Sequence, residues 1–320
     1  MERIVPITDY TFPSLAIEQA ILEAEGAKIA PHQCKTEAEV IAAVQGAQVV
    51  LAQFAPITRA ALAALAPQAT VVRYGVGYDN IDIRAARELG VQVAYVPDYC
   101  MDEVADHTVA LLLALARRLG PLEAELRAGG WRGIQAAGSM PALNQMTVGF
   151  IGLGRIGQAV LVRLRPFGCH FVVHDPMLSP NDATQLGVEL LGLADLLSQA
   201  HAISLHLPLT PATKYLINAE RLASMRQGAI IINTARGGLI DPLALAEALA
   251  QGQLAGAALD VFEQEPLPSD SPLRSAPRLI LTPHMSWYSD TAIGRLQRLA
   301  AEEAARALRG ERLRCPVTQS

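Results

Sequence analysis

The sequence predicts an α/β protein with two doubly wound domains, each built on a parallel sheet with helices on both faces. Two observations lead to this fold class. Short apolar runs alternate with stretches of helical apolar spacing over residues 1–100, and the alternation resumes from residue 146. The chain has 320 residues, which is long enough for two domains that each bury a core.

In the first alternating set, five apolar runs predict parallel strands, and the stretches between them predict helices. Continuous apolar runs of this length are typical of strands that are buried on both faces of a sheet. The predicted strands cover residues 4–7, 27–30, 48–52, 70–74 and 91–96, and the predicted helices cover 14–25, 36–45, 58–66 and 81–89.

A long helix rich in alanine and leucine is predicted over residues 101–119, followed by an irregular arm. Gly120-Pro121 is expected to end the helix, because proline lacks the backbone N–H that a helix interior needs. Glycines at positions 129, 130 and 138 and a proline at 141 indicate an arm without regular structure.

The second set opens with an apolar strand that runs directly into Gly152-x-Gly154-x-x-Gly157. In this order of strand, loop and helix, Gly152 permits a tight turn and Gly154 lets the backbone approach a pyrophosphate. Gly157 lets the helix pack closely on the strand, and the helix N-terminus attracts negative phosphates. The segment therefore predicts a dinucleotide site.

Asp175 indicates which dinucleotide is bound. It ends the next apolar run, residues 171–174, and lies 18 residues after Gly157. In this place its carboxylate would accept hydrogen bonds from the adenosine ribose and repel the extra phosphate of NADP, so NAD is the expected cofactor. The alternative is that Asp175, followed by Pro176, belongs to an ordinary turn at the end of a strand.

Later strands of the second set are predicted at residues 202–207, 229–234, 257–262 and 279–282, with a final helix over 291–309. The unit without the glycine loop comes first, and the final helix is expected to pack back on it. We therefore expect the second domain to be inserted into the first. Residues 1–100 and 286–320 would form the substrate-binding, catalytic domain, and residues 101–285 the NAD-binding domain.

Composition argues against several kinds of partner and location. A net charge of -5 predicts no attraction to nucleic acid or to acidic membranes. The first residues lack the pattern of a signal peptide, and the longest apolar stretch, 109–116, is too short to cross a bilayer. The four cysteines show no CxxC or metal-like spacing, so we expect reduced thiols, no metal and a cytoplasmic protein.

Reactive side chains lie at the ends of three predicted strands of the second set: Arg236, then Asp260 with Glu265, then His284. Ligands bind beyond the carboxyl ends of strands in open α/β sheets, so these side chains could meet in one crevice. Each alone has a simpler interpretation: a surface arginine in a turn, solvated acids in a proline-rich loop, and a structural histidine.

Together, three of these side chains match the needs of a 2-oxo acid reduction. Arg236 would bind the substrate carboxylate and the C2 carbonyl. A histidine paired with a carboxylate can hold a proton near neutral pH, so His284 would protonate the carbonyl oxygen while Glu265 orients the imidazole. Spacing alone leaves open whether the three side chains meet in space.

Over essentially its whole length the chain resembles the D-isomer-specific 2-hydroxyacid dehydrogenases. The matching motifs are the glycine loop and residues 75–82, 206–213, 233–241, 258–266 and 282–284. The resemblance implies a Rossmann domain inserted into a flavodoxin-like substrate domain. It also implies an NAD-dependent oxidoreductase that interconverts a small 2-oxo acid and a D-2-hydroxy acid, with Arg236, Glu265 and His284 as the catalytic residues.

The resemblance further implies the binding residues and a homodimer through region 101–140. Backbone amides around Val76 and Gly77 would hold the substrate carboxylate. Arg236 and His284 would contact the cofactor as well as the substrate. The remaining cofactor-binding residues are Gly152, Gly154, Arg155, Ile156, Gly157, Asp175, His206, Pro208, Thr213, Thr234, Ala235 and Asp260.

Two segments, 72–75 and 284–289, resemble the C-terminal binding protein branch of the family. In that branch, the position of Arg73 reaches the substrate carboxylate, and that of Trp287 forms an aromatic wall against the substrate side chain. Trp287 could equally anchor the following helix. The branch also raises an alternative function, an NADH-sensing scaffold that binds partner proteins.

Overall fold

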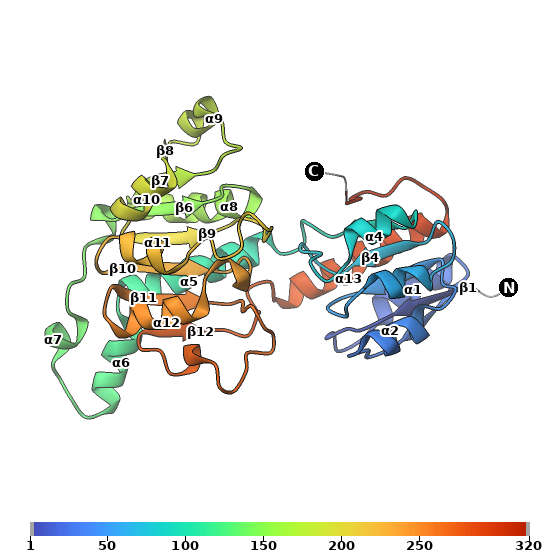
Figure 1. The fold of residues 1–320 in the computed structure, drawn as a ribbon, viewed down its shortest axis with the longest axis horizontal. Helices are drawn as coiled ribbons and strands as arrows, with labels where there is room; N and C mark the ends of the chain where they lie inside the picture. The colour runs from blue at the N-terminus through green and yellow to red at the C-terminus, as the bar shows by residue number, and fades with distance from the viewer. Residues whose placement is uncertain (1–2, 318–320) are drawn as a thin grey trace. The chain divides into compact units, whose positions relative to one another are not determined.

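The computed structural model describes residues 3–317 and divides the chain into two compact units. Unit 1 combines Met1–Cys100 with Tyr288–Ser320, and unit 2 is Met101–Trp287. Unit 2 is therefore continuous in sequence, whereas unit 1 is assembled from the two ends of the chain (Figure 1). Within residues 3–317, no helix has both the length and the apolar character needed to cross a membrane.

Unit 1 contains a five-stranded parallel sheet in the order β2-β1-β3-β4-β5. This is the flavodoxin-like order of a doubly wound sheet, in which the direction of winding reverses between β1 and β3. The strands are β1 (Arg3–Ile7), β2 (Ala27–Pro31), β3 (Val49–Ala52), β4 (Thr70–Arg73) and β5 (Gln92–Tyr95). The helices are α1 (Ala16–Ala24), α2 (Glu37–Val44), α3 (Arg59–Ala63), α4 (Ile83–Glu88) and α13 (Asp290–Leu308).

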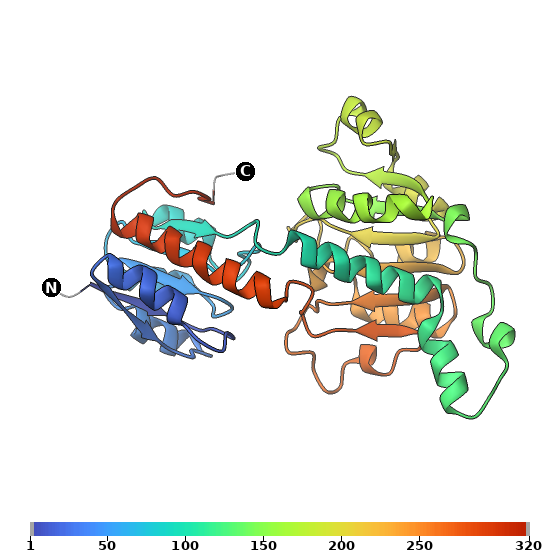
Figure 2. The same cartoon turned by 180° about the vertical axis from the view of Figure 1, so that it is seen from behind.

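The final helix, α13, packs beside α1 in unit 1 (Figure 2). The two helices meet at a buried polar contact, where the Gln297 amide donates to both oxygens of Glu18, at 3.1 and 2.9 Å. The Tyr74 hydroxyl also donates to Glu18, at 3.0 Å. Burial raises the pKa of the Glu18 carboxyl above its usual value, although these hydrogen bonds oppose the shift.

Unit 2 contains a seven-stranded parallel sheet in the order β12-β11-β10-β9-β6-β7-β8. This is a Rossmann-type order with a reversal between β6 and β9, so both sheets confirm the predicted fold class. The strands are β6 (Thr147–Ile151), β7 (His170–His174), β8 (Glu189–Leu190), β9 (Ala202–Leu205), β10 (Ala229–Asn233), β11 (Leu254–Leu259) and β12 (Leu279–Leu281).

Helices cover both faces of the unit 2 sheet, as the apolar strands require. One buried cluster joins the sheet to α5 (Met101–Ala116) and α8 (Arg155–Leu164). The other joins it to α10 (Leu193–Gln199), α11 (Ala219–Ser224) and α12 (Pro242–Ala250). The shorter helix α9 (Pro180–Gln185) leads to the edge strand β8.

The predicted end of the long helix at Gly120-Pro121 was wrong. Helix α5 ends at Ala116, and Arg118 adopts a left-handed φ of 55°. Helix α6 (Leu119–Arg127) then begins, with Pro121 in its first turn. A proline is tolerated there because the first-turn amides have no partner within the helix. The arm that follows, expected to be irregular, also contains a short helix, α7 (Gly133–Ala137).

Candidate active site

The glycine loop links the carboxyl end of β6 to α8, beside the reversal of strand order in unit 2. Gly152 has a φ of 85°, and a Cβ there would lie 2.7 Å from the carbonyl oxygen of His206. A Cβ on Gly157 would lie 3.0 Å from the Gly152 carbonyl. At Gly154, the N-cap of α8, a Cβ would meet nothing within 4 Å. The loop therefore leaves open space in front of a helix N-terminus, which fits a pyrophosphate group.

Asp175 follows β7 and connects two turns through its carboxylate. Oδ2 accepts a hydrogen bond from the Leu153 amide of the glycine loop at 2.8 Å, and Oδ1 accepts one from the Met177 amide at 2.9 Å. The second bond belongs to a strand-ending turn, which was the alternative interpretation of Asp175. An ionised carboxylate has about four acceptor positions, so two remain for ribose hydroxyls. Both interpretations are compatible with this geometry.

His206 follows β9 and lies against the glycine loop through its backbone. Its imidazole stacks on Phe150, with ring centroids 6.0 Å apart, and its Nε2 lies 2.8 Å from the Ser204 hydroxyl. Burial lowers the pKa of His206 to about 4, so the ring is neutral near pH 7. Further along this loop, the Thr213 hydroxyl donates to the Pro208 carbonyl at 2.8 Å. These contacts give the loop after β9 a defined shape beside Gly152.

Asn233 shapes the loop that carries Arg236. At the end of β10 its buried side chain donates to the Arg236 carbonyl at 2.8 Å and accepts from the Ala235 amide at 3.0 Å. The partly exposed Arg236 guanidinium donates to the Ala235 carbonyl at 2.6 Å. A Cβ on Gly237 would lie 1.9 Å from the carbonyl carbon of Phe262, so only glycine fits where this loop passes the next one.

His284 and Glu265 lie together at the same edge of the sheet. Nδ1 of His284 is 2.7 Å from Oε2 of Glu265, while Oε1 accepts a hydrogen bond from the Phe262 amide at 2.8 Å. Their side chains are 28% and 33% exposed, so the pair can be reached by a small ligand.

Opposing effects act on the pKa of Glu265. Burial raises it, but the hydrogen bond and charge of His284, the Phe262 amide and the charge of Arg236 outweigh burial. The pKa of Glu265 therefore lies below its usual value. The structure thus brings Glu265, His284 and the charge of Arg236 into one electrostatic group within unit 2.

The fully buried Asp260 holds the backbone around His284. Its carboxylate accepts the amides of Met285 and Ser286, each at 2.9 Å, and its carbonyl accepts the His284 amide at 2.7 Å. His284 has a left-handed φ of 54°, a conformation that L residues rarely adopt. The Trp287 indole N–H donates to the His284 carbonyl at 2.8 Å. Trp287 thus contributes to the same turn.

The other predicted substrate residues lie in unit 1, at the carboxyl end of β4. Arg73 is the last residue of that strand, and its guanidinium donates to the Tyr74 carbonyl at 2.6 Å. It also lies over the Phe54 ring, 5.8 Å from the centroid. Val76 and Gly77 follow in a partly exposed loop.

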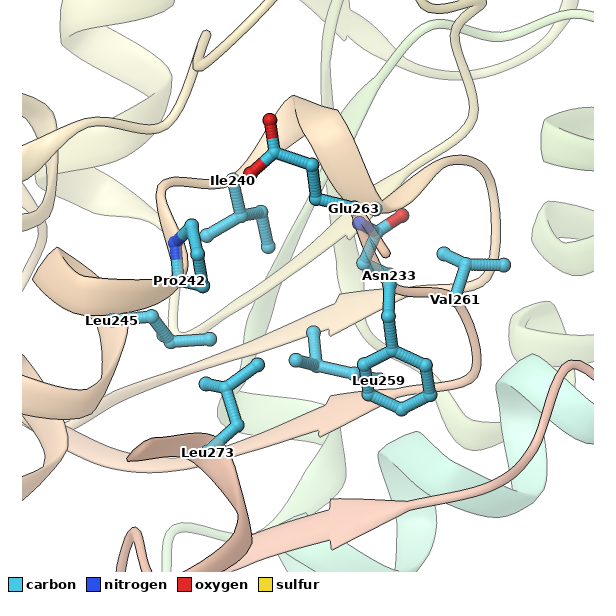
Figure 3. A pocket seen from close by; sticks show the side chains of 10 residues that line it. Asn233, Ile240, Pro242, Leu245, Leu259, Val261, Glu263 and Leu273 are labelled. Carbon is cyan, nitrogen blue, oxygen red and sulfur yellow. The ribbon is translucent and has the colours of Figure 1, made fainter. Parts of the chain in front are cut away.

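A small apolar hollow lies below the loops that follow β10 and β11 (Figure 3). Its empty volume is about 250 Å³, including space that opens to solvent. Leu245, Leu259 and Leu273 gather below Asn233, and Glu263 lies at the rim. The hollow lies outside the Glu265–His284 pair and the glycine loop. Among the described residues, no group of three or more His, Cys, Asp or Glu side chains could hold a metal ion.

Two residues near His284 had no role in the sequence analysis. His107, on α5, lies 3.1 Å through Nε2 from the Thr282 hydroxyl, which in turn lies 2.6 Å from Oδ1 of Asp260. Thr282 belongs to the motif that ends at His284, which was a usable signal. His107 lies 175 residues earlier on an alanine-rich helix, and nothing near it in the sequence indicates this contact.

Comparison with known proteins identifies the family. Residues 109–286 match the NAD binding domain of the D-isomer specific 2-hydroxyacid dehydrogenases. This match covers more than half of the chain and includes the glycine loop, Asp175 and the Glu265–His284 pair. The chain therefore belongs to the D-isomer specific 2-hydroxyacid dehydrogenase family, and NAD is the cofactor of its second domain.

Individual relatives cover most of the chain. It is 42% identical over 274 residues to D-3-phosphoglycerate dehydrogenase of Mycobacterium leprae, covering 85% of this chain and 51% of the relative. The chain thus spans about half the length of the curated relatives it matches. Among solved structures, the TT0316 protein of Thermus thermophilus is 37% identical, with a TM-score of 0.87 and coverage of 98% and 100%. D-lactate dehydrogenase of Aquifex aeolicus, solved with NAD and lactic acid, is 27% identical, with a TM-score of 0.86 and 96% coverage of both chains.

Proposed function

We propose that this protein catalyses the NAD-dependent interconversion of a small 2-oxo acid and the corresponding D-2-hydroxy acid. The observation that carries this proposal is the 2.7 Å contact between His284 and Glu265. The charge of Arg236 also acts on Glu265 and helps to lower its pKa. Family membership supports the same class of chemistry.

In the proposed mechanism each of the three side chains has its own role. Bound NADH supplies the hydride. Arg236 binds the substrate carboxylate and stabilises the negative charge that develops on the C2 oxygen. His284 donates a proton to that oxygen from Nε2, because Nδ1 is engaged with Glu265. Glu265, with its lowered pKa, stays ionised and keeps the imidazole oriented through its contact with Nδ1.

The proposed cofactor site follows the carboxyl edge of the unit 2 sheet. The open N-terminus of α8 at Gly154, with Arg155 and Ile156 in its first turn, would hold the pyrophosphate. Asp175 would bind the adenosine ribose. The loops after β9, β10 and β11 would flank the nicotinamide half through Pro208, Thr213, Thr234, Ala235 and Asp260.

The proposed substrate-binding residues come from both parts of the sequence. Backbone amides at Val76 and Gly77, together with Arg73, would hold the substrate carboxylate, and Trp287 would contact the substrate side chain. Relatives named for phosphoglycerate and for lactate make both phosphorylated and small unphosphorylated acids candidate substrates. We also propose a cytoplasmic location, which the cysteine spacing in the sequence supports because it shows no CxxC or metal-like pairing.

The activity is tested by mixing the protein with NADH and a panel of 2-oxo acids while absorbance at the reduced-nicotinamide band is followed. The panel contains glyoxylate, pyruvate, 4-methyl-2-oxopentanoate, 4-methylthio-2-oxobutyrate and 3-phosphohydroxypyruvate. We expect turnover of at least one acid and a loss of roughly a hundredfold in kcat for His284→Ala, the usual scale of general acid catalysis. NADH binding without any turnover, combined with NADH-dependent capture of partner proteins, would favour the scaffold alternative.

We also propose a homodimer through region 101–140. Four large apolar side chains on α6, α7 and the segment between them are exposed, with Trp131 88% and Ile134 87% accessible. Leu119 and Leu126 are each 57% accessible on α6. An exposed apolar group of this kind is typical of a protein interface. Light scattering should show a dimer for the wild type and for Met177→Glu, an exposed control position, and a monomer for the double variant Trp131→Glu, Ile134→Glu.

A further inference from the structure

Helix α5 reaches the loops that carry Arg236 and His284 through two adjacent residues, His107 and Thr108. The Thr108 hydroxyl donates to the Val104 carbonyl at 2.7 Å, within the helix. That bond uses its only proton, so the 2.9 Å contact with Thr234 must be donated by the Thr234 hydroxyl. Thr108 therefore holds the loop that leads to Arg236.

His107 makes the corresponding contact with the other loop. The Thr282 hydroxyl lies 2.6 Å from the Asp260 carboxylate, which also receives backbone amides and therefore acts as an acceptor. Because a hydroxyl has one proton, Thr282 donates it to Asp260 and accepts a hydrogen bond from Nε2 of His107 at 3.1 Å. Because Thr282 accepts this hydrogen bond, Nε2 of His107 must be the ring nitrogen that carries the proton in this contact.

This series of hydrogen bonds, from His107 through Thr282 to Asp260, ends at the backbone of His284. The Asp260 carboxylate accepts the two amides that follow His284, and the carbonyls of Asp260 and Thr282 accept the His284 amide, at 2.7 and 3.0 Å. A left-handed backbone at a non-glycine residue is strained and persists only where its surroundings determine it. At His284 these surroundings are Asp260 and Thr282, and Thr282 is itself held by His107.

We propose that His107 and Thr282 are positioning residues that hold His284 in the backbone conformation from which its imidazole meets Glu265. Neither side chain reacts in this scheme. His107 orients the Thr282 hydroxyl, Thr282 orients the Asp260 carboxylate, and Asp260 fixes the amides on the far side of His284. The effect on catalysis rests on the proposed function of His284 as the proton donor.

Matched substitutions separate the hydrogen-bond chain from simple packing. Thr282→Val removes the hydroxyl and keeps the shape, whereas Thr282→Ser keeps the hydroxyl. His107→Leu removes the donor, whereas His107→Gln retains an N–H donor near the position of Nε2. Thr184→Val serves as a control, because it deletes a threonine hydroxyl that donates to the Pro180 carbonyl on the surface helix α9.

We expect kcat to fall about tenfold in Thr282→Val and in His107→Leu, equivalent to roughly 1.4 kcal/mol of lost transition-state stabilisation. The dissociation constant of NADH, measured by fluorescence, should change less than twofold. Thr282→Ser and His107→Gln should recover most of the activity, and Thr184→Val should retain all of it. The proposal would be overturned if Thr282→Val and Thr282→Ser lost kcat equally. It would also be overturned if Thr282→Val kept full kcat while His284→Ala still lost it.

A spectroscopic measurement tests positioning without turnover. The imidazole ¹⁵N signals of His284 are assigned by their absence in His284→Asn, and their shifts report the hydrogen bond to Glu265. We expect these signals to move toward those of a free imidazole in Thr282→Val and to return in Thr282→Ser. Unchanged His284 signals in Thr282→Val would overturn the proposal even if the wild type turned over no acid, whereas an inactive wild type with moved signals would refute the proposed function alone.

Discussion

The two parallel sheets follow the same plan, but the crevices at their reversals of strand order are filled differently. In unit 1 the crevice lies between β1 and β3, and the Asp9 carboxylate accepts the amides of Gln53 at 3.0 Å and Phe54 at 2.6 Å. In unit 2 the crevice lies between β6 and β9, where Gly152 and Gly154 leave the N-terminus of α8 open.

This difference shows that the fold supplies a crevice and that local side chains decide what can bind there. An anion needs unoccupied N–H donors and a favourable potential. In unit 1 a buried carboxylate both occupies the donors and contributes negative charge. In unit 2 the helix of 10 residues presents its first amides with no acidic residue in its first turn. Only the second crevice suits a dinucleotide.

The largest expected effect comes from closing the crevice of unit 2. Gly152→Ala places a Cβ 2.7 Å from the His206 carbonyl at a φ of 85°, so the loop must move. We expect the affinity for NADH, measured by fluorescence titration, to fall by on the order of a hundredfold. The alanine adds backbone strain of about 1–3 kcal/mol, and the displaced loop no longer matches the pyrophosphate.

Two alanine controls separate strain from occupied space. Gly187→Ala has a similar φ of 59° with nothing near its Cβ, so it should lose some stability but no affinity for NADH. Gly154→Ala has open space around its Cβ and should fold normally, yet bind NADH more weakly where the pyrophosphate would approach. Unaltered NADH affinity in both Gly152→Ala and Gly154→Ala would remove the glycine loop from the cofactor site.

Just above pH 4.5, His206 in unit 2 and Glu18 in unit 1 should change the stability of their units in opposite directions as pH changes. His206 in unit 2 has a folded pKa of about 4 against 6.5 when unfolded, so the unfolded state binds more protons and unit 2 loses stability as pH falls through this range. The expected loss is about 2–3 kcal/mol by pH 4. Glu18 in unit 1 has a raised pKa, so unit 1 loses stability as pH rises above 4.5.

Urea unfolding at several pH values measures this contrast. Both tryptophans, Trp131 and Trp287, lie in unit 2, so tryptophan fluorescence reports the unfolding of that unit. Circular dichroism reports the unfolding of both units. His206→Asn should flatten the pH dependence of the fluorescence transition, and Glu18→Gln should flatten the remaining part seen by circular dichroism. Parallel pH dependence of the two transitions in the wild type would contradict the opposite signs.

A smaller effect is expected at Asp175, which distinguishes NAD from NADP in the crevice of unit 2. Asp175→Asn removes the negative charge and keeps a side-chain oxygen at the same distance along the side chain as Oδ2, which can accept the Leu153 amide. The ratio of kcat/KM for NADH over NADPH should fall about tenfold, the equivalent of roughly 1.4 kcal/mol of repulsion. If the wild type uses both cofactors equally well, Asp175 serves only its strand-ending turn.

Much of the fold could be predicted because its signals are local. Alternating apolar runs predict buried parallel strands, and the spacing of Gly152, Gly154 and Gly157 predicts a phosphate loop without knowledge of distant residues. The helix break at Arg118 was missed because it depends on a left-handed residue that has no glycine or asparagine signal. Pro121 then suggested an end where a new helix begins.

The site was partly predictable for the same reason. Arg236, Glu265 and His284 each follow an apolar run, so the rule that strand ends meet at one edge brings them together. The contact between His107 and Thr282 joins segments 175 residues apart, and it depends on how the tertiary fold places α5 beside the residue that follows β12. The hydrogen bonds of Asp9 in the crevice of unit 1 were also missed, because in the sequence Asp9 is simply a polar residue that follows a predicted strand. Its role appears only when β3 brings Gln53 and Phe54 beside it.

The smallest expected effect on the cofactor comes from Asp9→Asn in the crevice of unit 1. The amide side chain keeps the size of Asp9 but turns one N–H donor toward a backbone donor, at Phe54 or Gln53. Losing one buried hydrogen bond should lower the stability of unit 1 by about 1–3 kcal/mol in urea unfolding. NADH should still bind at one site per chain with an affinity within twofold of the wild type, because the nucleotide donors belong to unit 2. A second NADH site, or a changed affinity at the first, would mean that the crevice of unit 1 takes part in cofactor binding. The Asp9 carboxylate would then do more than accept the amides of Gln53 and Phe54.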